Sequence, residues 1–177
     1  MSNWYASRIR TVSGFPKAGV QFRDITTLLA DPQGLKRIVD DLVGRYKDVQ
    51  IDKVAGIDAR GFILGGAIAH QLETAFVPLR KPGKLPAQRH RMPFQKEYGS
   101  DSLEVHVDAI SSGDLVLIVD DLIATGGSAE AAVKLVQAAG GRVVAACFVV
   151  DLPYLGGAQK LRDMGVDVVT LCEFDKD

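Results

Sequence analysis

The sequence of 177 residues has no excess of charge of either sign, since 21 Lys and Arg face 22 Asp and Glu. A near-neutral chain gives no general reason to expect a nucleic-acid partner. Long apolar runs are also missing: the longest, at 143–150, is far shorter than the ~20 residues that a membrane-spanning helix needs. The first fourteen residues contain no apolar segment of the kind that a secretory signal requires. We therefore expect a soluble, cytoplasmic protein that binds neither membrane nor nucleic acid.

Cysteine is scarce as well. Only Cys147 and Cys172 are present, both in apolar surroundings and not at the spacing of metal ligands. Two buried, reduced thiols in a cytosolic protein are the simpler interpretation. Apolar residues make up 47% and charged residues 24% of the chain, which are ordinary values for a globular protein. Because no repeat, low-complexity tract or linker divides the chain, residues 1–177 are expected to form a single domain.

Short apolar segments alternate with helical patterns along most of the chain. Continuous apolar segments of this kind are typical of parallel strands that helices cover on both faces. Asp31, as N-cap, and Pro32 begin a further predicted helix that reaches about Tyr46. The pattern predicts an α/β fold with a parallel sheet flanked by helices. The predicted strands lie at 54–57, 75–79, 115–119, 143–150 and 166–171, a hairpin-like stretch at 94–107, and the predicted helices at 61–72, 128–139 and 157–164.

The most informative segment follows the predicted strand at 115–119. Two carboxylates, Asp120 and Asp121, come directly after the strand, and a Gly-Gly pair then opens the next predicted helix. Ligands of open α/β sheets bind at the carboxyl ends of the strands, and glycine lets backbone N–H groups approach an anion at a helix N-terminus. The hydroxyls of Thr125 and Ser128 add donors, so the segment suits a monophosphate. Because carboxylates repel a bare phosphate, they fit a ligand that also carries sugar hydroxyls or a divalent cation.

An isolated Gly-Gly pair would be interpreted as a plain turn, and the segment matches neither the Walker pattern nor G-x-G-x-x-G. Taken whole, Val-Asp-Asp-Leu-Ile-Ala-Thr-Gly-Gly-Ser at 119–128 resembles the phosphoribosyl pyrophosphate (PRPP) motif of type I phosphoribosyltransferases. The fold of that family is a parallel sheet flanked by helices, with a small hood that receives the base, expected here mainly within residues 1–30, and a mobile catalytic loop. The resemblance implies that Asp120 and Asp121 bind the ribose hydroxyls. It also implies that the 5′-phosphate lies among Ala124, Thr125, Gly126, Gly127 and Ser128.

A second loop, Ile-Asp-Ala-Arg-Gly at 57–61, also follows a predicted strand and opens a predicted helix. Alone, Arg60 would be interpreted as a surface arginine. Beside the first loop, Arg60 is expected to meet a phosphate together with backbone N–H groups. In the family the corresponding loop binds the pyrophosphate, which implies the same for Ala59 and Arg60.

The segment 80–91 holds five basic residues and no acidic one, and its prolines and glycine predict a loop. A solvated cationic loop is one interpretation. Its first part, Arg-Lys-Pro-Gly-Lys-Leu-Pro, is similar to the start of the mobile catalytic loop in adenine-specific members of the family. That resemblance implies that Arg80, Lys81 and Lys84 neutralise the leaving pyrophosphate and close over it.

The segment 15–27 resembles the N-terminal signature of the adenine-specific members, with Ala18 and Thr27 in place of two prolines that are common in the family. The resemblance implies that Phe22 and Leu152 sandwich the purine ring. Backbone groups of residues 21–23, Arg23 included, would line the Watson–Crick edge of the base and separate an amino group from an oxo group. A plain core role for Phe22 is the alternative.

Glu97-Tyr-Gly, followed by a Leu-Glu-x-His stretch, is similar to the region that carries the catalytic glutamate of the family. The resemblance implies that Glu97 accepts the proton that adenine loses when its N9 attacks, and such a group typically contributes ~10²–10⁴ in rate. Glu104 and His106 are expected on the surface of a strand.

The resemblance covers about residues 12–152 and implies that adenine and PRPP are converted to AMP and pyrophosphate. It further implies a homodimer, and Mg²⁺ that is held mainly by the substrate's pyrophosphate and by no metal ligands of the protein. Two alternatives stay open at this point. One is a related enzyme that uses hypoxanthine, guanine or xanthine, and the other is a regulator that binds PRPP or a purine without turnover.

Overall fold

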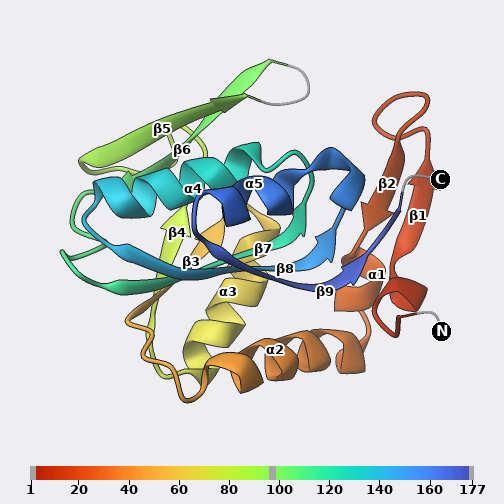
Figure 1. The fold of residues 1–177 in the computed structure, drawn as a ribbon, viewed down its shortest axis with the longest axis horizontal. Coiled ribbons are helices and arrows are strands. Elements are labelled where there is room, and N and C mark those ends of the chain that lie inside the picture. The colour runs from red at the N-terminus through yellow and green to blue at the C-terminus, as the bar shows by residue number, and fades with distance from the viewer. Residues whose placement is uncertain (1–2, 96–98, 176–177) are drawn as a thin grey trace.

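The structure is a computed structural model that describes residues 3–95 and 99–175. Its centre is a five-stranded sheet in the order β4-β3-β7-β8-β9, in which every neighbouring pair is parallel (Figure 1). The predicted α/β fold, with a parallel sheet flanked by helices, is confirmed. The strands are β3 (Lys53–Ile57), β4 (Ala75–Leu79), β7 (Leu115–Ile123), β8 (Arg142–Asp151) and β9 (Asp167–Glu173).

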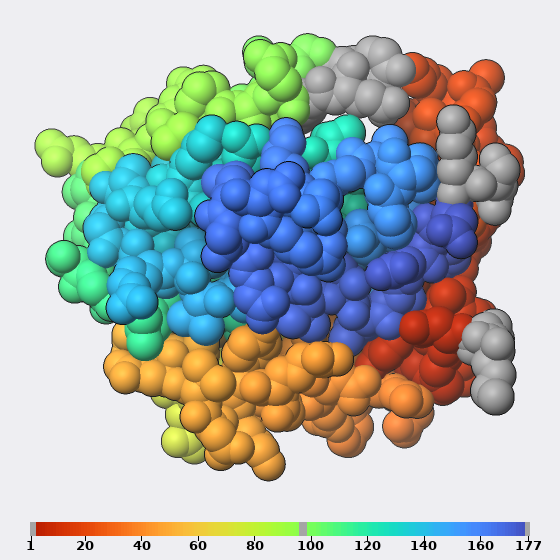
Figure 2. Space-filling model, viewed as in Figure 1, coloured from red at the N-terminus to blue at the C-terminus, as the bar shows by residue number. Residues whose placement is uncertain are grey.

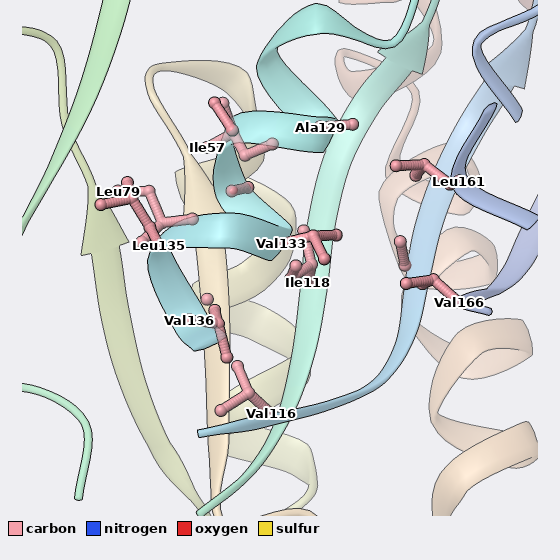
Figure 3. Close-up of a cluster of buried hydrophobic side chains, with 14 of the residues drawn as sticks. Ile57, Leu79, Val116, Ile118, Ala129, Val133, Leu135, Val136, Leu161 and Val166 are labelled. Atoms are coloured by element: carbon pink, nitrogen blue, oxygen red, sulfur yellow. The ribbon is translucent and has the colours of Figure 1, made fainter. Parts of the chain in front are cut away.

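Helices cover both faces of the sheet (Figure 1). One face carries α2 (Pro32–Tyr46) and α3 (Arg60–Gln71), and the other carries α4 (Gly127–Ala138) and α5 (Gly157–Asp163). Successive residues of a strand point to opposite faces, which explains why the strands are apolar throughout. In β7, Val116 and Ile118 pack in the cluster with α4, which Figure 3 shows, whereas Leu117 packs in the cluster with α2 and α3.

The start of α2 agrees with the sequence prediction. The Asp31 side chain accepts a hydrogen bond of 2.9 Å from the backbone N–H of Gln33, and Pro32 is the first helical residue. The helix buries Ile38, Leu42 and Tyr46 against the sheet, so its apolar face follows the helical period.

Two antiparallel hairpins stand outside the central sheet. The first joins β1 (Arg10–Ser13) to β2 (Gln21–Asp24), within the residues predicted for the hood, and it lies beside the carboxyl ends of β8 and β9 in Figure 1. The second pairs β5 (Arg89–Gln95) with β6 (Ser100–His106) and lies along α4, as Figures 1 and 2 show. The remaining elements are α1 (Thr26–Leu29) and two short 3-10 helices, η1 (Ala6–Arg8) and η2 (Pro153–Leu155). None of the helices within 3–95 and 99–175 is both long and apolar enough to cross a membrane.

Two predicted boundaries were wrong. Strand β7 continues to Ile123 instead of ending at 119, because its pairing with the long strand β8 continues through Asp120, opposite Phe148. The two carboxylates therefore lie in the strand and not in the loop after it. Similarly, the end of the basic segment is not loop: Arg89 begins β5, where it pairs with His106.

Candidate active site

A cavity of about 340 Å³ lies at the carboxyl ends of β3 and β7. We call it the phosphate cavity. It brings together the predicted phosphate loop, both carboxylates and two basic side chains from other parts of the chain. The predicted site residues that line it are Arg60, Lys81, Asp120, Asp121, Ala124, Thr125, Gly126, Gly127 and Ser128.

The loop between β7 and α4 turns sharply at Gly126, whose φ of +78° is a left-handed conformation that glycine adopts without strain. The loop is tied to the start of α5 by a hydrogen bond of 3.0 Å from the N–H of Gly157 to the carbonyl of Ala124. The first backbone N–H groups of an α-helix have no partner within that helix and favour an anion. The N-terminus of α4 therefore offers the cavity a set of donors for a phosphate group.

The two carboxylates differ in their surroundings. Asp121 is buried and accepts a hydrogen bond from Nε of Arg60, whose side chain is half exposed. Asp120 accepts a hydrogen bond of 2.8 Å from the N–H of Asp121. Burial, reinforced by the nearby charge of Asp121, raises the pKa of Asp120 well above its ordinary value. The carboxylate oxygens of Asp120 and Asp121 thus line the cavity as hydrogen-bond acceptors, and Asp121 is already paired with Arg60.

Asp58 connects the second loop to the basic segment. Its carboxylate lies 3.3 Å from Nε of Arg80 and accepts a hydrogen bond of 3.3 Å from the N–H of Lys81. The side chain of Lys81 reaches Asp101 of β6 at 2.9 Å and also lines the phosphate cavity. The peptide bond that follows Asp58 is cis. The carboxylates of Asp58 and Asp101 thus hold the start of the basic segment in place.

The prediction that Glu104 lies on a strand surface was wrong. Its side chain is only 1% exposed, pairs with Nε of Arg89 at 3.0 Å and accepts a hydrogen bond of 3.1 Å from the N–H of Gly83. Backbone hydrogen bonds also join Glu104 to Arg80 in both directions. Residues 80–89 cover this face of β6. The alternation of polar and apolar residues along the strand does not show that another segment covers it. His106 is half-buried, and its Nε2 accepts a hydrogen bond of 3.4 Å from Ala87.

A second cavity, of about 390 Å³, adjoins the first. We call it the base cavity. Phe22 and Arg23 of β2 line one part of it and Leu152, after β8, lines another, so the structure brings together the three residues predicted to surround the base. The ring of Phe22 also packs edge-to-face on Phe15, with 5.1 Å between the ring centroids. The residues common to both cavities are Arg60, Leu122, Ala124 and Leu155.

Not every predicted residue lies in these cavities. Among the described residues, Ala59, Arg80 and Lys84 are outside both linings, and Lys84 is exposed. Glu97 lies outside the described ranges. Within those ranges no group of three or more His, Cys, Asp or Glu residues is arranged to hold a metal ion.

Known proteins resemble this chain in both sequence and fold. Residues 24–176 match the phosphoribosyl transferase domain family. The chain is 61% identical over 169 residues to the adenine phosphoribosyltransferase of Azorhizobium caulinodans, covering 96% of this chain and 94% of that protein. The chain belongs to the adenine phosphoribosyltransferase family.

Solved structures of adenine phosphoribosyltransferases share the whole fold. The enzyme from Rhodothermus marinus superposes with a TM-score of 0.90 at 48% identity, covering 96% of each chain. The enzyme from Trypanosoma brucei, in complex with AMP, pyrophosphate and ribose-5-phosphate, gives a TM-score of 0.88 at 31% identity, covering 96% of this chain and 78% of that one.

Sequence reasoning missed several residues of the base cavity of this phosphoribosyltransferase. Tyr154 and Leu155 come from η2, which directly follows β8, and Asp175 follows β9. All three lie just beyond the carboxyl ends of parallel strands, where ligands of such sheets bind. That general rule was the signal that would have found them.

Proposed function

We propose that this chain is a pentosyltransferase that converts adenine and PRPP to AMP and pyrophosphate. The observation that carries the proposal is the pair of adjoining cavities: one is lined by the phosphate loop and two carboxylates, and the other mainly by apolar and aromatic side chains. A nucleoside monophosphate has the same sequence of parts, with an anion, a hydroxylated ring and a flat base. The complex of the Trypanosoma brucei relative with AMP, pyrophosphate and ribose-5-phosphate supports this choice of ligands.

The phosphate cavity is proposed to hold the ribose 5-phosphate part of PRPP. The 5′-phosphate accepts hydrogen bonds from the backbone and hydroxyl groups of residues 124–128, while Asp120 and Asp121 accept hydrogen bonds from the ribose hydroxyls. Arg60, Lys81 and the backbone at Ala59 bind the pyrophosphate. Because Arg60 already pairs with Asp121, the ribose and pyrophosphate subsites meet at this ion pair.

The base cavity is proposed to hold adenine between Phe22 and Leu152. A purine between the Phe22 ring and the Leu152 side chain has both of its faces removed from water. Backbone groups of residues 21–23, Arg23 included, would then form hydrogen bonds with the edge of adenine that carries the amino group. Glu97 is proposed as the acid/base that takes the proton from adenine, and it lies outside the described residues.

Catalysis is proposed to be mainly electrostatic. As the bond from C1 of the ribose to the pyrophosphate breaks, positive charge grows on the ribosyl group and negative charge on the leaving group. Arg60 and Lys81, which line the phosphate cavity, are proposed to stabilise the leaving group together with Arg80, which pairs with the cavity residue Asp58. Lys84 is proposed to join them from the exposed part of the basic segment.

Magnesium fits this site as part of the substrate. Two adjacent carboxylates, Asp120 and Asp121, line the phosphate cavity. Mg²⁺ prefers oxygen atoms of this kind, either as direct ligands or as partners of its bound water. The diphosphate of PRPP is proposed to hold the ion, and the bound ion would neutralise charge on the leaving pyrophosphate.

Three further features belong to the proposal. The two cysteines are buried and free, which suits a reducing, cytoplasmic location. A homodimer is proposed from the family resemblance, and light scattering after size-exclusion chromatography tests it. A single domain over residues 1–177, with the hood mainly within 1–30, is consistent with the first hairpin and remains a prediction.

The test is an assay of pyrophosphate release from PRPP and Mg²⁺ with adenine, hypoxanthine, guanine or xanthine. We expect turnover with adenine at least a hundredfold above that with each oxo-purine, because a site that hydrogen-bonds one exocyclic group leaves buried polar groups unpaired with the other. Turnover with an oxo-purine would favour the alternative of a related phosphoribosyltransferase that uses hypoxanthine, guanine or xanthine. Binding of PRPP without turnover of any base would favour the regulator.

A further inference from the structure

The two glycines of the phosphate loop are required for different reasons. Gly126 needs its positive φ, whereas Gly127 is the first residue of α4 and has helical backbone angles. Helical angles suit any L-residue, and alanine is a better helix former than glycine. The backbone conformation therefore does not explain why residue 127 has no side chain.

The space around Gly127 explains it. A Cβ atom at this position would lie 2.5 Å from the carbonyl oxygen of Gln95 and 3.2 Å from Cδ2 of Phe94. The first contact is with a backbone atom of β5, which cannot move by a simple change of rotamer. A methyl group at 127 would push the end of β5 away from α4.

This contact lies at the wall of the phosphate cavity. Phe94, Gln95 and Gly127 line that cavity, and the same three residues line a separate cavity of about 300 Å³, here called the outer cavity, whose other lining residues come from β5, α4 and α5. The outer cavity is bordered by Glu130, which pairs with Lys134 at 2.6 Å, and by Lys160. The end of β5, which lies beside α4 in Figure 1, thus forms with Gly127 a wall that the phosphate cavity and the outer cavity share.

We propose that Gly127 is a positioning residue that seats the end of β5 on α4 and closes this wall of the phosphate cavity to water. This inference rests on the proposed function, because it concerns what water would do to PRPP. If water enters, its oxygen bonds to C1 of the ribose as the bond from C1 to the pyrophosphate breaks, and its proton goes to the solvent. The products are ribose 5-phosphate and pyrophosphate in place of AMP and pyrophosphate.

The test is Gly127→Ala, with pyrophosphate and AMP measured in the same reaction. In the wild-type protein the two products should form in a ratio close to one. In the variant we expect the ratio to rise above two and kcat for AMP to fall by about tenfold or more, since small displacements in an active site cost up to ~10²-fold. The dissociation constant for PRPP should change by less than threefold, because every backbone N–H of the loop is kept. Amide hydrogen exchange should become faster within residues 89–95.

Gly66→Ala is the matched control. Gly66 is also a helical glycine, in α3, and outside its chain neighbours and the backbone of its own helix a Cβ there would meet none of the described atoms within 4 Å. This control should keep the wild-type product ratio and kcat. Should Gly127→Ala not fold, Phe94→Ala is the second variant, since it removes a side chain of the same wall and leaves the loop intact; the product ratio should again rise.

Three results would overturn the inference: an unchanged product ratio, unchanged exchange of residues 89–95, or a dissociation constant for PRPP that rises well above threefold while kcat for AMP stays at the wild-type value. Failure of the proposed function is recognised separately. In that case the wild-type protein itself forms no AMP, while the exchange experiment still reports whether residue 127 seats β5.

Discussion

Replacing Glu104 by glutamine should destabilise the protein and disturb its basic segment. The carboxylate is buried, pairs with Arg89 at 3.0 Å and accepts a hydrogen bond of 3.1 Å from Gly83. Glutamine keeps the shape and one acceptor but loses the charge. Because the Arg89 side chain is 41% exposed, water can solvate it again, so the loss is that of charged hydrogen bonds, about 1.5–3 kcal/mol. For a chain of this length that corresponds to a fall in Tm of about 3–12 °C.

Thermal unfolding followed by circular dichroism measures this effect. Glu130→Gln is the matched control. The Glu130 carboxylate also forms ion pairs with two lysines, but its side chain is 28% exposed, and exposed ion pairs contribute about 0–1 kcal/mol to stability. Glu104→Gln should also raise the KM for PRPP, since Gly83, two residues after Lys81 of the phosphate cavity, loses its charged hydrogen-bond partner. An equal change in Tm for the two variants, or a fall below 2 °C at Glu104, would refute the reasoning.

Three further predictions concern other titratable groups. The raised pKa of the buried Asp120, with Asp121 beside it, means that the folded state binds this proton more tightly than the unfolded state, so stability falls as pH rises through the raised pKa. The Tm of Asp120→Asn minus that of the wild type should therefore increase between pH 4 and pH 7. A difference in Tm that is constant with pH would contradict this. Glu97→Gln should lower kcat about a hundredfold or more while the KM for PRPP stays within threefold; an unchanged kcat would remove Glu97 from the mechanism. Burial raises the pKa of both Cys147 and Cys172 to about 12, so a thiol reagent at pH 8 should label them in guanidinium but not in the folded protein.

The central sheet could be predicted from the sequence because its strands are apolar throughout and its helices carry local signals such as the Asp31 cap. The phosphate loop was equally visible, since the residue types that bind a sugar phosphate are contiguous there. These features depend on short stretches of chain, and local chemistry decides them.

Features that depend on contacts between distant segments could not be predicted. Strand β7 is longer than its apolar run because β8 supplies partners up to Asp151. Glu104 is buried because residues 80–89 fold over it. Likewise, the close approach of Gln95 to Gly127 is a packing contact between two elements with no sequence signature. Tertiary packing sets all three.

The most direct test of the whole account is a crystal structure of the protein with AMP. We predict that the phosphate oxygens lie within hydrogen-bonding distance of the backbone N–H groups of Thr125 and Gly126, with the base between Phe22 and Leu152. A nucleotide bound with its phosphate in any other place, away from the loop between β7 and α4, would contradict the account.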